Sequence, residues 1–178
     1  MSVLSDQDIK KEILNGRIVI LPPPPPEAFG PNSVDLRLSC DFWFYNYKST
    51  KNLPVDIQKM SYKEVTQKKR CKEVILEPGQ LCLGMTLERV SLPPDIMANI
   101  GGKSSIGRMG LTVHITAPFH HAGASNRIML EIKNEGPLKL KLRDGMQICQ
   151  LVFERLESPT SIPYSKIGRV IKDQEKSE

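Results

Sequence analysis

Short apolar segments that alternate with polar residues constrain the fold of this chain more than any other feature of its sequence. Val34, Leu36 and Leu38 alternate with polar residues, as expected for a strand with one buried face. Residues 42–47 predict another strand, and from Val74 onward further short segments are separated by turn signals. Helices do not alternate with these strands, so the sequence disfavours a parallel Rossmann-type sheet and predicts an all-β barrel or sandwich.

One helix is expected before the strands, over residues 6–15. Ser5 can cap it, Asp8 follows three residues later as in a capping box, and Gly16 is a stop signal. The uninterrupted run Pro22 to Pro26 cannot join the interior of a sheet. We interpret this run as a stiff connector; a ligand for a proline-binding domain is the less favoured alternative.

The size and charge of the chain limit its class. A length of 178 residues suits a single domain, and a formal net charge of +5 favours anionic partners without requiring nucleic acid. No apolar run approaches the roughly 18 residues of a membrane span. The first residues lack the pattern of a signal peptide, so we expect a cytoplasmic protein with no membrane partner. Residues 48–73 are polar and lysine-rich, and we expect a solvated surface excursion there.

The four cysteines do not form a recognisable metal or redox motif. They are Cys40, Cys71, Cys82 and Cys149. No C-x-x-C pair is present, so a zinc ribbon is excluded and we expect reduced, buried cysteines. His120 and His121 are adjacent, and neighbours on a strand point to opposite faces, so we expect no metal site there either.

Residues 101–108 read Gly-Gly-Lys-Ser-Ser-Ile-Gly-Arg and have the features of an anion-binding loop. The glycines permit close backbone approach, the hydroxyls can donate hydrogen bonds, and Lys103 and Arg108 carry positive charge. The segment is not a Walker A loop, because it lacks that motif's glycine spacing. An ordinary turn is the alternative interpretation.

Glu131 is a carboxylate inside an apolar strand expected over residues 128–134. Met129 and Lys133 lie on the same face as Glu131, whereas Ile128, Leu130 and Ile132 point to the other face. A carboxylate partly withdrawn from water suits general acid–base chemistry near neutral pH. The alternative, which the pattern alone favours, is a surface glutamate paired with Lys133.

Several segments, taken in order, resemble the dCTP deaminase family, a branch of the trimeric dUTPase-like fold. Residues 102–111, 113–117 and 128–131 carry most of the resemblance, the last of these with a Leu-Glu pair. The remaining matching segments are 4–9, 32–38, 86–88, 92–93, 137–138, 145–151 and 163–164. The resemblance implies a mainly β fold, a distorted barrel or jelly roll with an N-terminal helix, in one domain over residues 1–178.

This resemblance implies the hydrolytic deamination of dCTP to dUTP and ammonia, without zinc. Glu131 would act as general acid and base on the water that attacks C4 of cytosine. Ser104 would bind near the attacked carbon, and Arg108 would help to hold Glu131 and the water. The chain accordingly lacks the His-x-Glu and Pro-Cys-x-x-Cys pattern of the zinc-dependent deaminases.

The resemblance also implies a set of residues that bind the nucleotide. The loop at 103–108 would bind phosphate with Tyr164 at the same end, and the backbone of Ile115 and Ala117 would read the base. The full set is Lys103, Ser104, Ser105, Ile106, Gly107, Arg108, Ile115, Ala117, His121, Met129, Leu130, Glu131, Gln150, Tyr164, Lys172 and Gln174. Mg²⁺ would be bound through the triphosphate, and the family's homotrimers have sites between subunits.

The segment 121–126 departs from the family pattern Asp-Pro-Gly-aromatic-x-Gly. His121 stands in place of the Asp that meets the sugar hydroxyl. Ala124 stands in place of the aromatic residue beside the deoxyribose, which would leave that space open and alter the selectivity for the sugar.

Residues 165–178 would form a C-terminal lid in which either Lys172 or Arg169 serves the phosphates and Gln174 ends the lid. The outcome of the reaction stays open. Besides a dCTP deaminase, the chain could be a bifunctional enzyme or a dUTPase that gives dUMP, or a nucleotide-binding regulator without turnover. Inhibition by dTTP also stays open.

Overall fold

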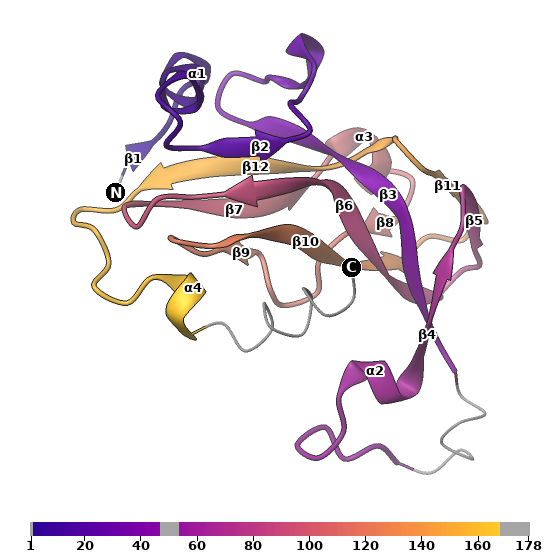
Figure 1. Ribbon diagram of the computed structural model, residues 1–178. Helices are drawn as coiled ribbons and strands as arrows, with labels where there is room; N and C mark the ends of the chain where they lie inside the picture. Colours follow the sequence, from indigo (N-terminus) through magenta and orange to yellow (C-terminus); the bar gives the residue numbers. More distant parts are fainter. Residues whose placement is uncertain (1, 47–53, 168–178) are drawn as a thin grey trace.

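Antiparallel strands make up most of the structure (Figure 1), a computed structural model that describes residues 2–46 and 54–167. The strands are β1 (Ser2–Val3), β2 (Val19–Leu21), β3 (Val34–Tyr45), β4 (Thr66–Arg70), β5 (Glu73–Leu76), β6 (Leu81–Ser91), β7 (Ile96–Gly102), β8 (Leu111–Thr112), β9 (Phe119–His120), β10 (Ser125–Asn134), β11 (Leu140–Arg143) and β12 (Gln147–Arg155). The helices are α1 (Asp6–Leu14), α2 (Tyr62–Val65), α3 (Ser104–Gly107) and α4 (Tyr164–Ile167), with a 3-10 turn η1 (Pro26–Ala28). No helix in the described part of the chain is long and apolar enough to cross a membrane.

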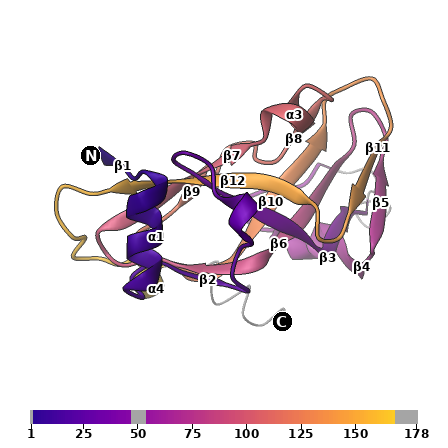
Figure 2. The same cartoon turned by 90° about the horizontal axis from the view of Figure 1, so that it is seen from above.

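Within the described residues, ten strands form one sheet. Its order is β8-β10-β6-β3-β12-β7-β9, with β1 beside β12, β2 beside β6 and β4 beside β3. A separate antiparallel pair joins β5 and β11. The long strands curl around a common core, with α1 at one end of the molecule and the β5–β11 pair at the other (Figures 1 and 2). The prediction of a mainly β chain with an N-terminal helix is therefore confirmed.

The N-terminal helix forms as its sequence predicts. Asp8 N donates to Ser5 Oγ and Ser5 N donates to Asp8 Oδ2, each at 3.2 Å, which completes the capping box. Gly16 follows the helix with a φ of 68°, a conformation that favours glycine. Residues 22–25 link β2 to η1, as expected of a connector.

A ring of ion pairs fastens α1 to the sheet. Glu12 accepts from Arg17 and from Arg155, each at 2.6 Å. Asp95 accepts from the same two arginines, at 2.6 Å and 3.1 Å. Because each carboxylate bridges both arginines, the four side chains form a closed network between the start and the end of the fold.

The strand β3 is continuous, whereas the sequence predicted two strands, over 34–38 and 42–47. A bulge where β3 pairs with β6 breaks the alternation of apolar and polar residues. Ser39 and Asp41 are buried at this bulge, and the Arg127 guanidinium donates to both, at 2.6 Å and 3.0 Å. These polar residues are inside the fold because Arg127 satisfies them, which no local pattern reveals.

The polar stretch predicted over 48–73 carries α2 and β4. We call residues 54–70 the arm. β4 pairs with the last part of β3, from Asp41 opposite Arg70 to Tyr45 opposite Thr66. The prediction of a solvated excursion holds for most of β4, but it is wrong for Tyr62, which is half-buried.

Candidate active site

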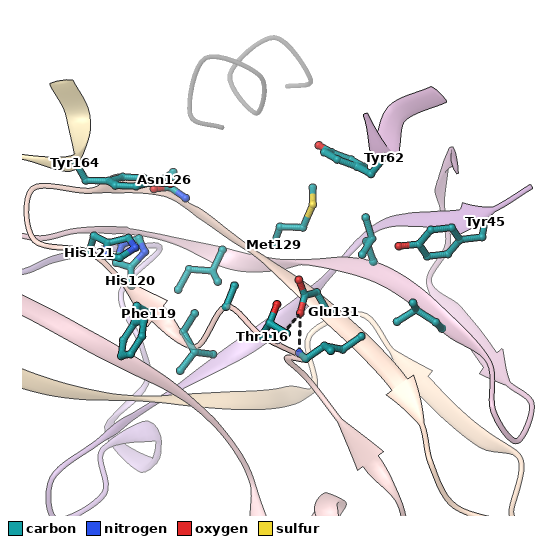
Figure 3. A pocket seen from close by; sticks show the side chains of 16 residues that line it. Tyr45, Tyr62, Thr116, Phe119, His120, His121, Asn126, Met129, Glu131 and Tyr164 are labelled. Carbon is teal, nitrogen blue, oxygen red and sulfur yellow. Dashed lines mark hydrogen bonds between the residues drawn. The ribbon is translucent and has the colours of Figure 1, made fainter. Parts of the chain in front are cut away.

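A cavity of about 450 Å³ lies against β6 and β10 (Figure 3). Its walls come from β3, the arm, the segment 115–121 and α4. The lining residues are Tyr45, Tyr62, Leu81, Leu83, Ile100, Ile115, Thr116, Ala117, Phe119, His120, His121, Asn126, Ile128, Met129, Glu131 and Tyr164. Glu131 is the one carboxylate among these lining residues, so a single acidic group faces a largely apolar and aromatic space.

Backbone N–H groups hold Glu131 at the edge of this cavity. Glu131 Oε2 accepts hydrogen bonds from Ile115 N at 2.6 Å and from Thr116 N at 3.2 Å. The N–H of Glu131 itself donates to Val113 O at 3.1 Å, which fixes the same segment against β10. Figure 3 shows the other carboxylate oxygen turned away from these donors and towards the cavity. Hydrogen bonds to a charged acceptor are strong and directional, so the carboxylate is oriented before any ligand binds.

The ion pair formed by Lys133 decides between the two interpretations of Glu131. Lys133 pairs with Glu135, 2.9 Å away, so the prediction of a surface Glu131 paired with Lys133 is wrong. Met129 lines the cavity beside Glu131, as the alternation predicted. Leu130 is buried in the core and does not line the cavity.

Three aromatic rings form one wall of the cavity. The His121 ring stacks on the Tyr164 ring, with centroids 4.9 Å apart, and its centroid lies 6.1 Å from that of Phe119. His120 also borders the cavity, but its ring is buried and its Nε2 lies 3.0 Å from Val90 O. Burial lowers the pKa of His120 to about 4, so this ring is neutral near pH 7. The adjacent histidines therefore occupy two different environments.

A glycine allows α4 to pack against the turn that carries His121. Gly123 has a φ of 77°, and a Cβ at this position would lie 2.6 Å from Pro163 Cβ. Tyr164 N donates to Ala122 O at 3.0 Å, which seats the Tyr164 ring on His121. Ala124 is buried and does not line the cavity, and the altered selectivity for the sugar stays a prediction.

The turn that includes α3 lies apart from the lining of the cavity. Lys103 Nζ forms an ion pair with Asp35 and donates to Gln147 Oε1 at 3.1 Å. Gln150 Nε2 donates to Gly102 O at 3.0 Å. These contacts tie the start of the turn to β3 and β12, and the cation of Lys103 is already neutralised by a carboxylate.

The predicted site residues thus fall into separate groups. The cavity brings together Glu131, Ile115, Ala117, His121, Met129 and Tyr164. The residues that do not line it are Lys103, Ser104, Ser105, Ile106, Gly107, Arg108, Leu130 and Gln150. Ser104, Ser105 and Arg108 are exposed to solvent. Lys172 and Gln174, with most of the predicted lid, lie outside the described residues.

Comparison with known proteins assigns the family. A family model described as dCTP deaminase-like matches residues 3–156. The chain belongs to this family. Among the relatives of this dCTP deaminase-like chain, a protein of Methanosphaera stadtmanae named "dCTP deaminase, dUMP-forming" is 40% identical over 171 residues, which cover 95% of this chain and 87% of the relative. A protein of Rhodospirillum rubrum named "dCTP deaminase" is 40% identical over 172 residues, which cover 91% and 87%.

A solved structure has the same fold. The 2'-deoxycytidine 5'-triphosphate deaminase of Agrobacterium tumefaciens matches with a TM-score of 0.66 and 20% identity over 86% of this chain. The match covers 48% of that protein, so the present chain spans about half of its length. At this identity the likeness concerns the fold alone, and it confirms the fold expected from the resemblance.

Sequence reasoning missed several residues of the dCTP deaminase-like cavity. Tyr45 and Tyr62 line it from β3 and the arm, and Phe119 extends the aromatic wall. Of these residues, Tyr62 alone has a signal in the sequence, because it is an aromatic side chain within a lysine-rich stretch that is predicted to be exposed to solvent. Thr116 contributes its backbone N–H, and the type of a residue does not show where its backbone N–H will point.

Proposed function

We propose that the protein catalyses the hydrolytic deamination of dCTP, with the cavity around Glu131 as the site of the base. The observation that carries this proposal is the Glu131 carboxylate, held on one oxygen by two backbone N–H groups and turned towards the cavity with the other. Membership of the dCTP deaminase-like family supports it.

The proposed reaction uses the free oxygen of Glu131 as a proton carrier. A water molecule beside this oxygen loses a proton to it and attacks C4 of cytosine. The carboxyl group returns this proton to the ring nitrogen N3. It then takes a second proton from the new hydroxyl on C4 and passes it to the amino group, so the C–N bond breaks, ammonia leaves and a uracil base results. The apolar and aromatic lining excludes bulk water from this exchange, and the backbone donors prevent the carboxylate from rotating.

We propose that the exposed α3 turn completes the site of a neighbouring subunit in a homotrimer. In one chain Ser104 and Arg108 are exposed and do not line the cavity, although both are polar groups suited to a nucleotide. Met109, which follows Arg108, and Ile115, which lines the cavity, are apolar side chains that are also exposed. An interface here would bury this apolar surface and would add the polar turn to the cavity.

The triphosphate would carry Mg²⁺ as part of the substrate. No group of three or more His, Cys, Asp or Glu side chains in residues 2–46 and 54–167 is arranged to hold a metal ion. Phosphate oxygens are themselves good ligands of Mg²⁺. The protein would then contribute hydrogen bonds and charge to the phosphates rather than direct ligands, and the deamination itself would not require zinc.

The second candidate is a bifunctional enzyme that also releases diphosphate and forms dUMP. The name "dUMP-forming" of the Methanosphaera stadtmanae relative favours it. The test is incubation of the purified protein with dCTP and Mg²⁺, followed by measurement of ammonia, dUTP, dUMP and diphosphate. Ammonia with dUTP supports deamination alone, ammonia with dUMP and diphosphate supports the bifunctional enzyme, and binding of dCTP without any product contradicts both.

A mixing experiment tests the shared site. Glu131→Gln and Arg108→Ala are expected to be inactive separately, because each removes one half of the site. Coexpression should restore part of the activity, since some mixed trimers then contain a site with both wild-type residues. Failure of every mixture to regain activity, with a trimer shown by light scattering, would exclude a site shared in this way.

A further inference from the structure

Two of the four cysteines lie opposite each other where β3 and β4 meet. Asp41 pairs with Arg70 in the antiparallel ladder, which places Cys40 opposite Cys71 at the next position. The backbone confirms this register, because Cys71 N donates to Cys40 O at 2.8 Å. Both cysteines are half-buried, so the prediction of four buried cysteines is wrong for this pair.

The two side chains are on the same face of the ladder. Directly opposed residues of an antiparallel pair point to the same face, and Cys71 lies opposite Cys40. Cys71 packs against the same core cluster that contains Phe42. Directly opposed residues with a backbone hydrogen bond have Cα atoms about 5.5 Å apart. This lies within the roughly 4.4–6.8 Å that a disulfide requires.

A positively charged side chain lies beside the sulfur atom of Cys40. Arg70 Nη2 donates to Cys40 Sγ at 3.2 Å, and the Arg70 side chain is largely exposed to solvent. The guanidinium therefore places a positive charge directly beside the Cys40 sulfur. Cys82 and Cys149 differ, because both are fully buried and burial raises the pKa of Cys82 to about 12.

We propose that Cys40 and Cys71 form a reversible disulfide when the protein meets a small disulfide oxidant such as oxidised glutathione. Cys40, as its thiolate, attacks one sulfur of the oxidant, forms a mixed disulfide and releases one small thiolate. Cys71 then loses its proton and attacks Cys40 Sγ, which releases the second small thiolate. Two protein thiols are oxidised to one disulfide, and one small disulfide is reduced to two thiols.

The bond would close the base of the segment that carries two residues of the cavity. Tyr45 and Tyr62 both lie between the two cysteines in sequence and both line the cavity. The inference goes beyond the proposed function, and the formation of the bond does not depend on deamination.

The test is treatment of the native full-length protein with oxidised glutathione, alkylation of the remaining thiols and mass spectrometry of a digest without reduction. We expect a peptide that joins Cys40 to Cys71, a loss of two of the four alkylable thiols, and full reversal by dithiothreitol. Cys82 and Cys149 should be alkylated only after unfolding. Stable glutathione adducts on both Cys40 and Cys71, or four intact thiols, would overturn the proposal.

Four variants separate the pair from accidental oxidation. Cys71→Ser should stop the reaction at a glutathione adduct on Cys40, whereas Cys82→Ser should leave the cross-link unchanged. Arg70→Gln should slow the cross-link several-fold relative to Lys69→Gln, which removes a charge from the neighbouring position without touching Cys40. Equal rates of cross-linking in Arg70→Gln and Lys69→Gln would reject the role of Arg70. A cross-link to Cys82 or Cys149 would reject the pairing of Cys40 with Cys71.

Discussion

The cavity around Glu131 and the turn at Lys103 hold their charged groups in opposite ways. Glu131 is fixed by backbone N–H groups on one oxygen, and its other oxygen faces the cavity. Lys103 is held by the side chains of Asp35 and Gln147, at the start of a turn whose next residues are exposed. Within one chain the Glu131 carboxylate therefore faces the cavity, whereas the polar turn does not line it. In the proposed homotrimer, a neighbouring subunit would bring this turn to the nucleotide.

Glu131→Gln tests the role of the cavity and should lower the rate of deamination more than the other variants. The glutamine oxygen can still accept from the two backbone N–H groups, but its amide cannot carry a proton. We expect deamination to fall by about 10²- to 10⁴-fold while nucleotide binding is retained. The measurement is single-turnover release of ammonia together with calorimetric binding of dCTP. Glu135→Gln is the control, because it changes a surface carboxylate on the same segment, and an unchanged rate in Glu131→Gln would reject the mechanism.

Ile115→Pro should cause the second largest loss of deamination, because proline removes the N–H that donates to Glu131 at 2.6 Å. A hydrogen bond to a charged group contributes roughly 1.5–3 kcal/mol, so deamination should fall by about 10- to 100-fold. Ile115→Ala is the matched control, since it truncates the same side chain and keeps the N–H. If both variants lose activity equally, the side chain rather than the backbone donor positions the carboxylate.

Lys103→Met should affect stability as well as binding. It leaves the Asp35 carboxylate without its ion-pair partner, and we expect the free energy of unfolding in urea to fall by about 1–2 kcal/mol. The double variant with Asp35→Leu should recover part of this loss. Unchanged stability in Lys103→Met would show that Lys103 is free to serve phosphate alone.

Gly123→Ala should have the smallest effect, confined to the edge of the cavity. The new Cβ would press on Pro163 and lift Tyr164 away from His121, so the KM for dCTP should rise more than kcat falls. Gly145→Ala is the control, because Gly145 has a similar φ of 81° with no atom within 4 Å of an added Cβ. In both variants an alanine must adopt a positive φ, which costs about 1 kcal/mol of stability. A rise in KM in both variants would therefore show that backbone strain, and not the loss of the His121–Tyr164 stack, causes the effect.

The parts of the fold that could be predicted from sequence are those with local causes. The capping box at Ser5 and the alternation along β10 each depend on neighbours in the chain, and both were predicted correctly. The continuity of β3 was not, because Asp41 is buried through a contact with Arg127, far away in sequence. The same holds for the candidate site: residue types located Glu131, but only the path of the chain supplies the N–H groups that orient it.

The ring of ion pairs at α1 has a consequence for the folding of the chain during its synthesis on the ribosome. The partners of the N-terminal segment are made late: Arg155 closes the ring with Glu12, and β1 pairs with the end of β12. These contacts of the N-terminal segment therefore cannot form until residue 155 has been synthesised. During this interval the pairing of β1 with β12 and the ion pair of Glu12 with Arg155 are missing, so the seating of α1 depends on completion of the sheet.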